Sequence, residues 1–223
     1  MQRSTSRMVW LVFRKEILSA LRFKAAWAAM VMFSLTALAA VSLSLYGIVP
    51  SPKMAASLLW LVLFFSASVG LDRMFGEEAA QNTLLALRVY GTSGAVLWGK
   101  LLYSLVLLLG LGIFTVAIFF LFIGTETASP FLFFLVLAAG LWGMAGAGVL
   151  IAALTVAAEA RSGLFSVLLL PVLLPVLLPA IYLTGELFAE KGVELTYLGG
   201  IVLYDVILTL AASMLFDSLW QEL

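Results

Sequence analysis

Residues Val96 to Ile123 read VLWGKLLYSLVLLLGLGIFTVAIFFLFI, an apolar run whose only charge is Lys100. A bilayer core about 30 Å thick is crossed by about 20 apolar helical residues, so this run is long enough to span a membrane. Charge and turn clusters separate it from other such runs, which we predict at Ala25 to Ile48, Ala55 to Leu71, Phe131 to Ala157, Leu164 to Leu183 and Leu198 to Leu219. The sequence therefore predicts an all-α polytopic membrane protein with six transmembrane helices.

The composition agrees with a membrane environment. Of the 223 residues, 64% are hydrophobic and only 11% are charged, and the mean hydropathy is +1.18. That leaves too little polar surface to cover a water-soluble globule of this size. Little of the chain remains outside the predicted spans, so we expect residues 1–223 to form a single transmembrane domain.

The supply of reactive side chains excludes several classes of function. The chain contains no cysteine and no histidine, which excludes disulfides, thiolate chemistry and structural zinc and removes the usual protein ligands of haem. The formal net charge is zero, so the overall charge does not favour nucleic acid as a partner. We therefore expect the chain to bind no cofactor directly.

The distribution of basic residues predicts the orientation. One side of the predicted spans contains ten of the 12 basic residues, namely Arg3, Arg7, Arg14, Lys15, Arg22, Lys24, Arg73, Arg88, Lys100 and Arg161. The opposite side contains Lys53 and Lys191. Cytoplasmic loops of membrane proteins are enriched in lysine and arginine, so we predict a multi-pass protein of the bacterial inner membrane with both termini in the cytoplasm.

The N-terminal segment, Met1 to Lys24, is predicted to be an amphipathic entry helix that lies on the inner leaflet. Its basic side chains share one side of a helix, and the apolar side is formed by Val9, Val12, Phe13, Ala20 and Phe23. Glu16 breaks this pattern because it projects from the apolar side, where an unpaired carboxylate is costly. We therefore expect Glu16 to have a partner or to lie at a bend.

The longest polar stretch is the inner loop, residues 72–100. Within it, Glu77 to Leu87 (EEAAQNTLLAL) is predicted to form a short helix with leucines available for packing. This helix either docks on a cytoplasmic partner or lies on the membrane or on neighbouring helices. Gly94 to Lys100 matches the start of a phosphate-binding loop, but Leu101 replaces the required Ser or Thr and no strand precedes it. We therefore predict no nucleotide site in this chain.

Three prolines in the fifth predicted span, Pro171, Pro175 and Pro179, are spaced by four residues and so lie along one helical face. Each removes the N–H that would bond the carbonyl four residues earlier. Unpaired carbonyls are costly in hydrocarbon, so we expect this face to point inward and the helix to be bent or locally unwound. The prolines mark either a mobile element or a static kink.

Asp205 is an acid inside the sixth predicted span, beside Tyr204. An ionisable group at that depth has to be neutral, paired or in contact with a polar cavity. Intramembrane proteases and transferases need a second acid, a Ser-Lys or His set, or metal ligands. Asp205 stands alone in the sequence in this respect, so we predict a chain without catalytic residues of its own.

Two further patterns have ordinary interpretations. Glutamates recur every four residues on the outer side, where a lysine and solvent favour a plain charged surface over a metal site. They are Glu186, Glu190 and Glu194, with Lys191 between them. The fourth span contains small residues every four positions, a surface of the kind that allows close helix packing. These are Ala139, Gly143 and Ala147.

Three segments together resemble the CcmB family, the membrane subunits of an ABC transporter in cytochrome c maturation. They are the basic entry helix VFRKEILSALR (12–22), the inner loop LDRMFGEEAAQNTLLALRVYGTSGAVLWGKLL (71–102) and the fifth-span sequence LLLPVLLPVLLPAIYL (168–183). The similarity covers nearly the whole chain. One departure is Gln81-Asn82-Thr83, which lacks the glycine that many relatives place before the threonine.

The resemblance implies the fold of a type-2 ABC exporter permease, with the short loop helix as a coupling helix seated on an ATPase subunit. The positions it assigns to this coupling loop are Glu77, Glu78, Thr83, Leu84 and Leu87. Since both glutamates are expected to be exposed, reversing their charges should weaken docking without unfolding the chain.

The resemblance also implies partners. The family works with a separate ATPase that binds ATP, a tryptophan-rich membrane subunit that handles haem, and a small single-span subunit. Either a second copy of the chain or a different subunit completes the transmembrane pair. The expected function is to couple ATP hydrolysis to haem export or to release of a haem-loaded chaperone, with haem as cargo. The alternative is an ABC-2 type permease that exports lipid, drug or polysaccharide.

Overall fold

A computed structural model describes residues 5–22, 24–80, 89, 91–127, 129–158 and 164–220, and its secondary structure over these residues is helical. The helices are α1 (Thr5–Arg22), α2 (Ala25–Leu45), α3 (Pro52–Leu71), α4 (Arg73–Ala80), α6 (Ser93–Ile123), α7 (Pro130–Ala157), α8 (Leu164–Phe188) and α9 (Leu195–Leu219). Six helices of the described chain are long and apolar enough to cross a membrane. The predicted all-α class and the six spans are therefore confirmed.

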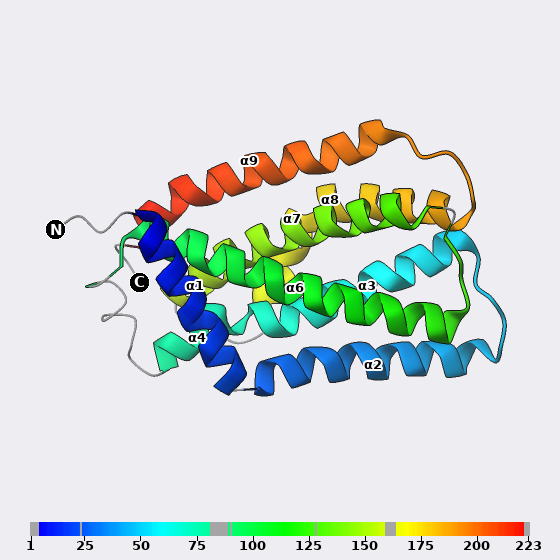
Figure 1. The fold of residues 1–223 in the computed structure, drawn as a ribbon, viewed down its shortest axis with the longest axis horizontal. Helices are drawn as coiled ribbons and strands as arrows, with labels where there is room; N and C mark the ends of the chain where they lie inside the picture. The colour runs from blue at the N-terminus through cyan, green and yellow to red at the C-terminus, as the bar shows by residue number, and fades with distance from the viewer. Residues whose placement is uncertain are drawn as a thin grey trace.

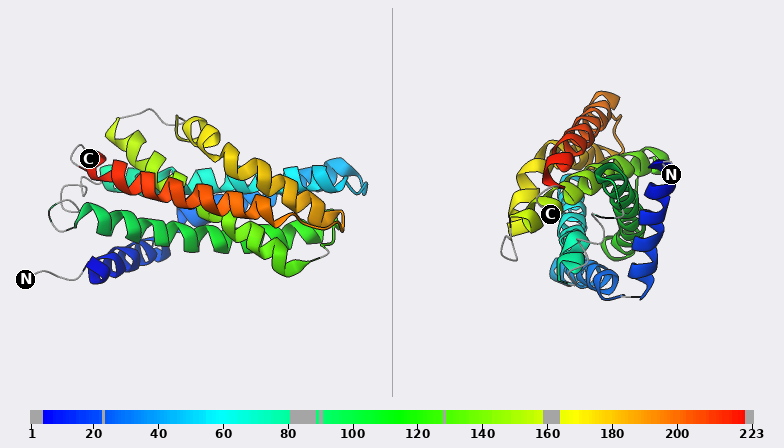
Figure 2. Two further views of the ribbon diagram at one scale, coloured as in Figure 1. Left: turned by 90° about the horizontal axis from the view of Figure 1, so that it is seen from above. Right: turned by 90° about the vertical axis from the view of Figure 1, so that its left-hand side faces the viewer.

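The spanning helices run side by side along the long axis of the molecule (Figure 1). The start of α1 and the end of α9 lie at the same end of the bundle, together with α4. The opposite end contains the connections 46–51, 124–127 and 189–194. Helices α2 and α9 lie on opposite sides of the bundle, as the end-on view shows (Figure 2). We call the end with α1 and α4 the α1 end, and the other the loop end.

Local sequence explains where the helices begin and end. The side chain of Thr92 accepts a hydrogen bond from the backbone N–H of Ala95 at 3.4 Å, which caps the start of α6. Gly124 ends the same helix with φ of 70°, a left-handed conformation that glycine adopts without strain. Helices α3 and α7 each begin with a proline, Pro52 and Pro130, at the position where its missing N–H costs nothing.

Helix α7 is the centre of the bundle. Of its most apolar stretch, 78% is buried, against 17% for α2 and 22% for α9. Its small residues let other helices approach closely: a Cβ atom on Gly140 would lie 2.3 Å from the Trp60 ring of α3, and one on Gly148 would lie 2.6 Å from Leu71. The predicted small residues of this span are packed as well: Ala139 and Ala147 are buried, and a Cβ atom on Gly143 would lie 3.0 Å from Val176 of α8.

The prediction that the proline face points inward is wrong, and so is the predicted local unwinding. Pro171 and Pro175 are exposed and Pro179 is half-buried, so this face points outward, and α8 is helical throughout from Leu164 to Phe188 rather than locally unwound. The buried face is formed by side chains that include Leu169, Leu173, Val176 and Ala180. A proline ring widens a helix on its own side, and helices that surround a core are convex outward, so the outer side is where the ring fits best.

Candidate functional site

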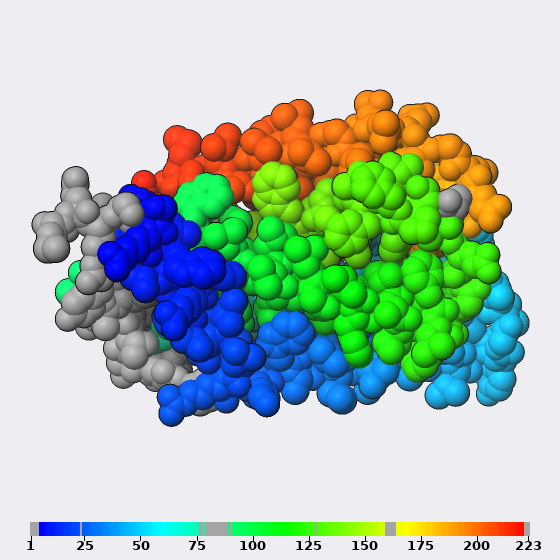
Figure 3. Space-filling model, viewed as in Figure 1, coloured from blue at the N-terminus to red at the C-terminus, as the bar shows by residue number. Residues whose placement is uncertain are grey.

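Helix α1 lies across the α1 end and packs on α6, where it covers the first turns of that helix (Figure 3). Contact is close because of Gly99 in α6: a Cβ atom there would lie 2.6 Å from the Cβ of Val12. The basic side chains Arg7 and Arg14 are exposed and Val12 is buried. The predicted amphipathic entry helix is therefore present, with its apolar side on the bundle.

A buried group of charges lies where α1, α4 and α6 meet. Lys100 of α6 is fully buried, and its Nζ lies 2.9 Å from Oε1 of Glu16 in α1 and 2.8 Å from Oε2 of Glu78 in α4. The same Nζ donates a hydrogen bond to the carbonyl oxygen of Met74 at 2.5 Å. It also lies 4.4 Å from the centre of the Phe75 ring, a cation–π contact.

Lys15 completes this group, which we call the Lys100 cluster: Lys15, Glu16, Glu78 and Lys100. The Nζ of Lys15 lies 3.1 Å from Oε1 of Glu16 and pairs with Oε1 of Glu78. The Lys15 side chain is 46% exposed, whereas that of Lys100 is 0% exposed, so the cluster has one solvent-accessible and one fully buried cation. Two ammonium groups and two carboxylates balance each other, which makes their burial tolerable.

The electrostatic environment shifts the pKa values of the two cluster members on α1, Glu16 and Lys15. Burial alone raises the pKa of Glu16, but Lys100 and then Lys15 more than offset that effect, so the pKa lies below its ordinary value. Burial alone lowers the pKa of Lys15, but Glu16 and Glu78 outweigh it, so the pKa lies above its ordinary value. Both groups are therefore held in their charged forms.

Acidification is expected to weaken the cluster. Because the pKa of Glu16 is lowered on folding, its contribution to the free energy of unfolding is present above the pKa of an unfolded glutamate, about 4.3, and is lost as the pH falls through the lower folded value. Thermal unfolding in lipid nanodiscs should show that stability falls as the pH is lowered through this range, and that Glu16→Gln makes this slope of stability against pH less steep. The variant Glu126→Gln, in the exposed connection after α6, serves as control and should keep the wild-type slope. Equal slopes in wild type and Glu16→Gln would contradict this account.

The structure corrects the expectation for Glu78. Its side chain is 8% exposed and faces Lys100, so it is not an exposed position, and reversing its charge would gather three cations around the single carboxylate of Glu16. The physical reason is that α1 and α6 each present a lysine to the inner side of α4. Glu77 also lies in α4, which begins at Arg73, before the predicted helix start. Thr83, Leu84 and Leu87 lie outside the described residues.

Sequence reasoning missed the cluster but contained one sign of it. Lys100 was assigned only to the basic inner side, and Lys15 only to the polar face of α1. Glu16 was expected to need a partner, and its pairing with Lys100 confirms that need. A lysine within a predicted span and a glutamate on an apolar helix face are each costly to bury alone, and pairing them compensates both charges.

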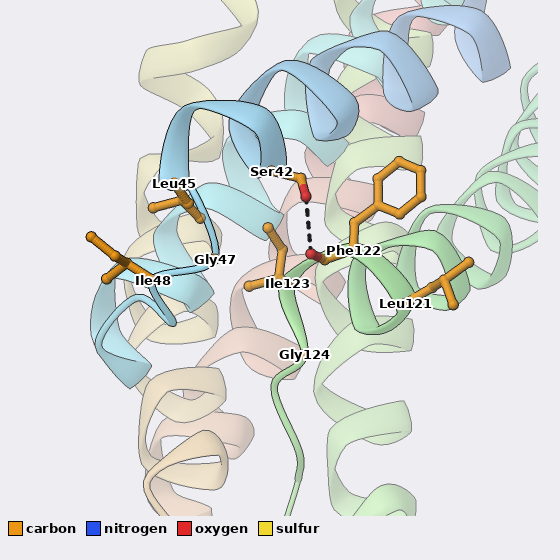
Figure 4. Close-up of a pocket in the computed structure, with 8 residues that line it drawn as sticks. All are labelled: Ser42, Leu45, Gly47, Ile48, Leu121, Phe122, Ile123 and Gly124. Carbon is orange, nitrogen blue, oxygen red and sulfur yellow. Dashed lines mark hydrogen bonds between the residues drawn. The ribbon is translucent and has the colours of Figure 1, made fainter.

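Elsewhere in the described residues, charged groups do not converge on a site. No three of their Asp, Glu, His or Cys side chains are placed to hold a metal ion, and Glu186 faces Lys191 at 4.0 Å. At the loop end, a pocket lies between the ends of α2 and α6 (Figure 4), where Ser42 donates a hydrogen bond to the carbonyl of Phe122 at 3.1 Å. Its lining residues include no ionisable group, and Ser42 is their only polar side chain.

The fold defines an all-α, multi-pass membrane protein whose one charged cluster among the described residues joins α1, α4 and α6. A family model described as CcmB protein matches residues 7–215, and the chain belongs to the CcmB family. It is therefore a permease subunit, a membrane component of a haem-exporting ABC system in cytochrome c maturation. Among curated proteins, no match to the chain is found.

Proposed function

We propose that this subunit couples ATP hydrolysis by a separate ATPase to haem export or to release of a haem-loaded chaperone, and that the Lys100 cluster transmits the motion. The observation that supports this most is the position of Glu78. It lies in α4, the helix at the start of the inner loop, and it pairs with cations from both α1 and α6. ATP is bound by the partner, and haem is the cargo of the complex.

The proposed path begins where the ATPase docks, on the inner loop around Glu77, Thr83, Leu84 and Leu87. A displacement of this loop moves α4. Glu78 then pulls on Lys100 of α6 and on Lys15 of α1, and Glu16 links those two lysines to each other. Leaving a buried charge without its partner costs about 3–5 kcal/mol, so the three helices move together rather than sliding apart.

The proposed orientation places the α1 end in the cytoplasm, in the bacterial inner membrane. The described basic residues support it, because most of them belong to helices or connections at that end: Arg7, Arg14, Lys15, Arg22, Lys24, Arg73 and Lys100. Lys53 and Lys191 lie at the loop end. The further partners we propose are a tryptophan-rich haem-handling subunit, a small single-span subunit, a second copy of this chain and membrane lipid.

Deleting the gene is expected to abolish covalent haem attachment to c-type cytochromes, because the ABC system would lack its coupling subunit. Complementation with wild type should restore attachment, and Lys100→Met should not, although some protein remains in the membrane. The control is Lys53→Met at the loop end, where the lysine is exposed. Normal haem attachment in the deletion strain would overturn the proposed function. Full rescue by Lys100→Met, with the ATPase still bound, would overturn only the coupling path.

A further inference from the structure

Asp205 is the most isolated acid in the described part of the chain. It lies near the middle of α9, its residue is 1% exposed, and neither carboxyl oxygen has a hydrogen-bond partner among the described residues. Its backbone carbonyl accepts a hydrogen bond from Thr209 Oγ1 at 2.7 Å, but this leaves the carboxyl group itself without a donor. The Lys100 cluster does not include it, and the proposed coupling path does not use it.

The carboxyl group points into the junction of α7, α8 and α9. A Cβ atom on Gly143 of α7 would lie 2.4 Å from Oδ1 of Asp205 and 3.0 Å from Val176 of α8. The absence of a side chain at Gly143 therefore provides the space that the carboxyl group occupies. No described side chain or backbone group donates a hydrogen bond to either carboxyl oxygen, so an ionised carboxylate has no compensation there.

None of the titratable groups described on the helices around this junction donates a hydrogen bond to the Asp205 carboxyl group. Helix α7 contains none. Those of α8 are Tyr182 and Glu186, toward the loop end, where Tyr182 contacts Tyr197. On α9 itself, the Tyr204 hydroxyl donates to the carbonyl of Val172 at 2.7 Å, and Asp217 accepts from Ser93 at 2.5 Å. Helix α6, which also contacts α9, contributes Tyr103 and Lys100, and the ammonium group of Lys100 is bound to Glu16 and Glu78.

An uncompensated carboxylate at this depth costs several kcal/mol, whereas the neutral acid is far less costly. We propose that Asp205 is a proton-binding site of the α7–α8–α9 junction: the packed junction requires the protonated acid, and a separation of α9 from α7 that admits water releases the proton. In the release step the O–H bond breaks, the proton passes to water, and the electron pair stays on the carboxylate. Opening of this junction is thus linked to pH.

Infrared spectroscopy of the full chain in lipid nanodiscs at neutral pH tests the protonation directly. We expect a carbonyl stretch of a protonated carboxylic acid that disappears in Asp205→Asn and persists in Asp217→Asn, a matched change at an exposed position on the same helix. Gly143→Ala should shift or remove the band, because the new methyl group takes the space of Oδ1. Gly146→Ala should not, because its Cβ atom would have no neighbour closer than 3.6 Å. Absence of an Asp205-dependent band would overturn the proposal.

A disulfide reporter tests the link to helix separation. The chain has no cysteine, and a Cβ atom on Gly146 would lie 3.6 Å from Thr209 Oγ1, so Gly146→Cys with Thr209→Cys places two thiols across the α7–α9 contact. The yield of cross-linking by a copper–phenanthroline oxidant is measured for this cysteine pair with Asp205 and in an Asp205→Asn background. Dividing the two yields cancels the pH dependence of thiol chemistry. The cross-link yield with Asp205, divided by the yield in the Asp205→Asn background, should fall as the pH rises. A ratio that stays constant with pH would overturn the link between proton and packing.

Discussion

Replacing Lys100 by methionine is expected to destabilise the protein by about 3–5 kcal/mol, because Glu16 and Glu78 would then share the single, half-exposed ammonium group of Lys15. The loss comes from leaving buried carboxylates under-compensated, and a methionine of similar volume does not change the packing greatly. Thermal unfolding in nanodiscs would measure it. Lys53→Met, which removes an exposed lysine at the loop end, is the matched control and should change stability little.

The same reasoning predicts a partial rescue. Adding Glu16→Gln to Lys100→Met removes one of the two acids, so Lys15 and Glu78 can pair alone, and the double variant should be more stable than Lys100→Met. An additive result, with the double variant less stable than either single variant, would mean that the four side chains do not act as one group. Glu16 would then be coupled to the bundle only through α1 packing.

Truncating Trp60 to alanine is expected to cost about 3–5 kcal/mol, the usual range for a large buried aromatic side chain. Trp60 of α3 is 1% exposed, packs against Gly140 of α7, and donates from Nε1 to Thr184 Oγ1 of α8 at 2.9 Å. Its loss opens a cavity between three spans and leaves the Thr184 hydroxyl without this partner. Thermal unfolding measures the effect, with Trp98→Ala, at a residue 42% exposed, as control.

Gly140 supplies a second check on the Trp60 contact. Gly140→Ala alone should destabilise the bundle, because the added methyl would overlap a ring that its hydrogen bond to Thr184 holds in place. In the Trp60→Ala background the same methyl enters the cavity and should cost little. Equal costs in both backgrounds would show that the ring moves away freely, contrary to the geometry described.

The number and positions of the spans were predictable because they depend on length and hydropathy alone. A run of apolar residues has to be helical in a membrane, whatever its neighbours are. The amphipathic entry helix was predictable for the same kind of reason, since the periodicity of charged and apolar residues is local. The need of Glu16 for a partner followed from its position on the apolar face, without knowledge of the fold.

Pairings between distant residues could not be predicted in this way. Glu16, Glu78 and Lys100 come together only because α1 crosses the end of α6, and nothing local in the sequence specifies that crossing. The outward prolines of α8 were mistaken for an inward face because a leucine-rich helix has apolar side chains all round. With a nearly uniform surface, the buried side is decided by side-chain fit to α3 and α7, which only the assembled bundle reveals.

The Lys100 cluster also bears on how the chain is made. Synthesis runs from the N-terminus, so Glu16 and Glu78 have both been made before Lys100 leaves the ribosome. Glu16 belongs to α1 and Glu78 to α4, and neither helix is among the six that are long and apolar enough to span a membrane. Lys100 belongs to α6, the only one of the three helices that is a candidate span, and both of its counter-ions precede it in the chain. Insertion of the third span therefore completes the cluster instead of stranding a charge.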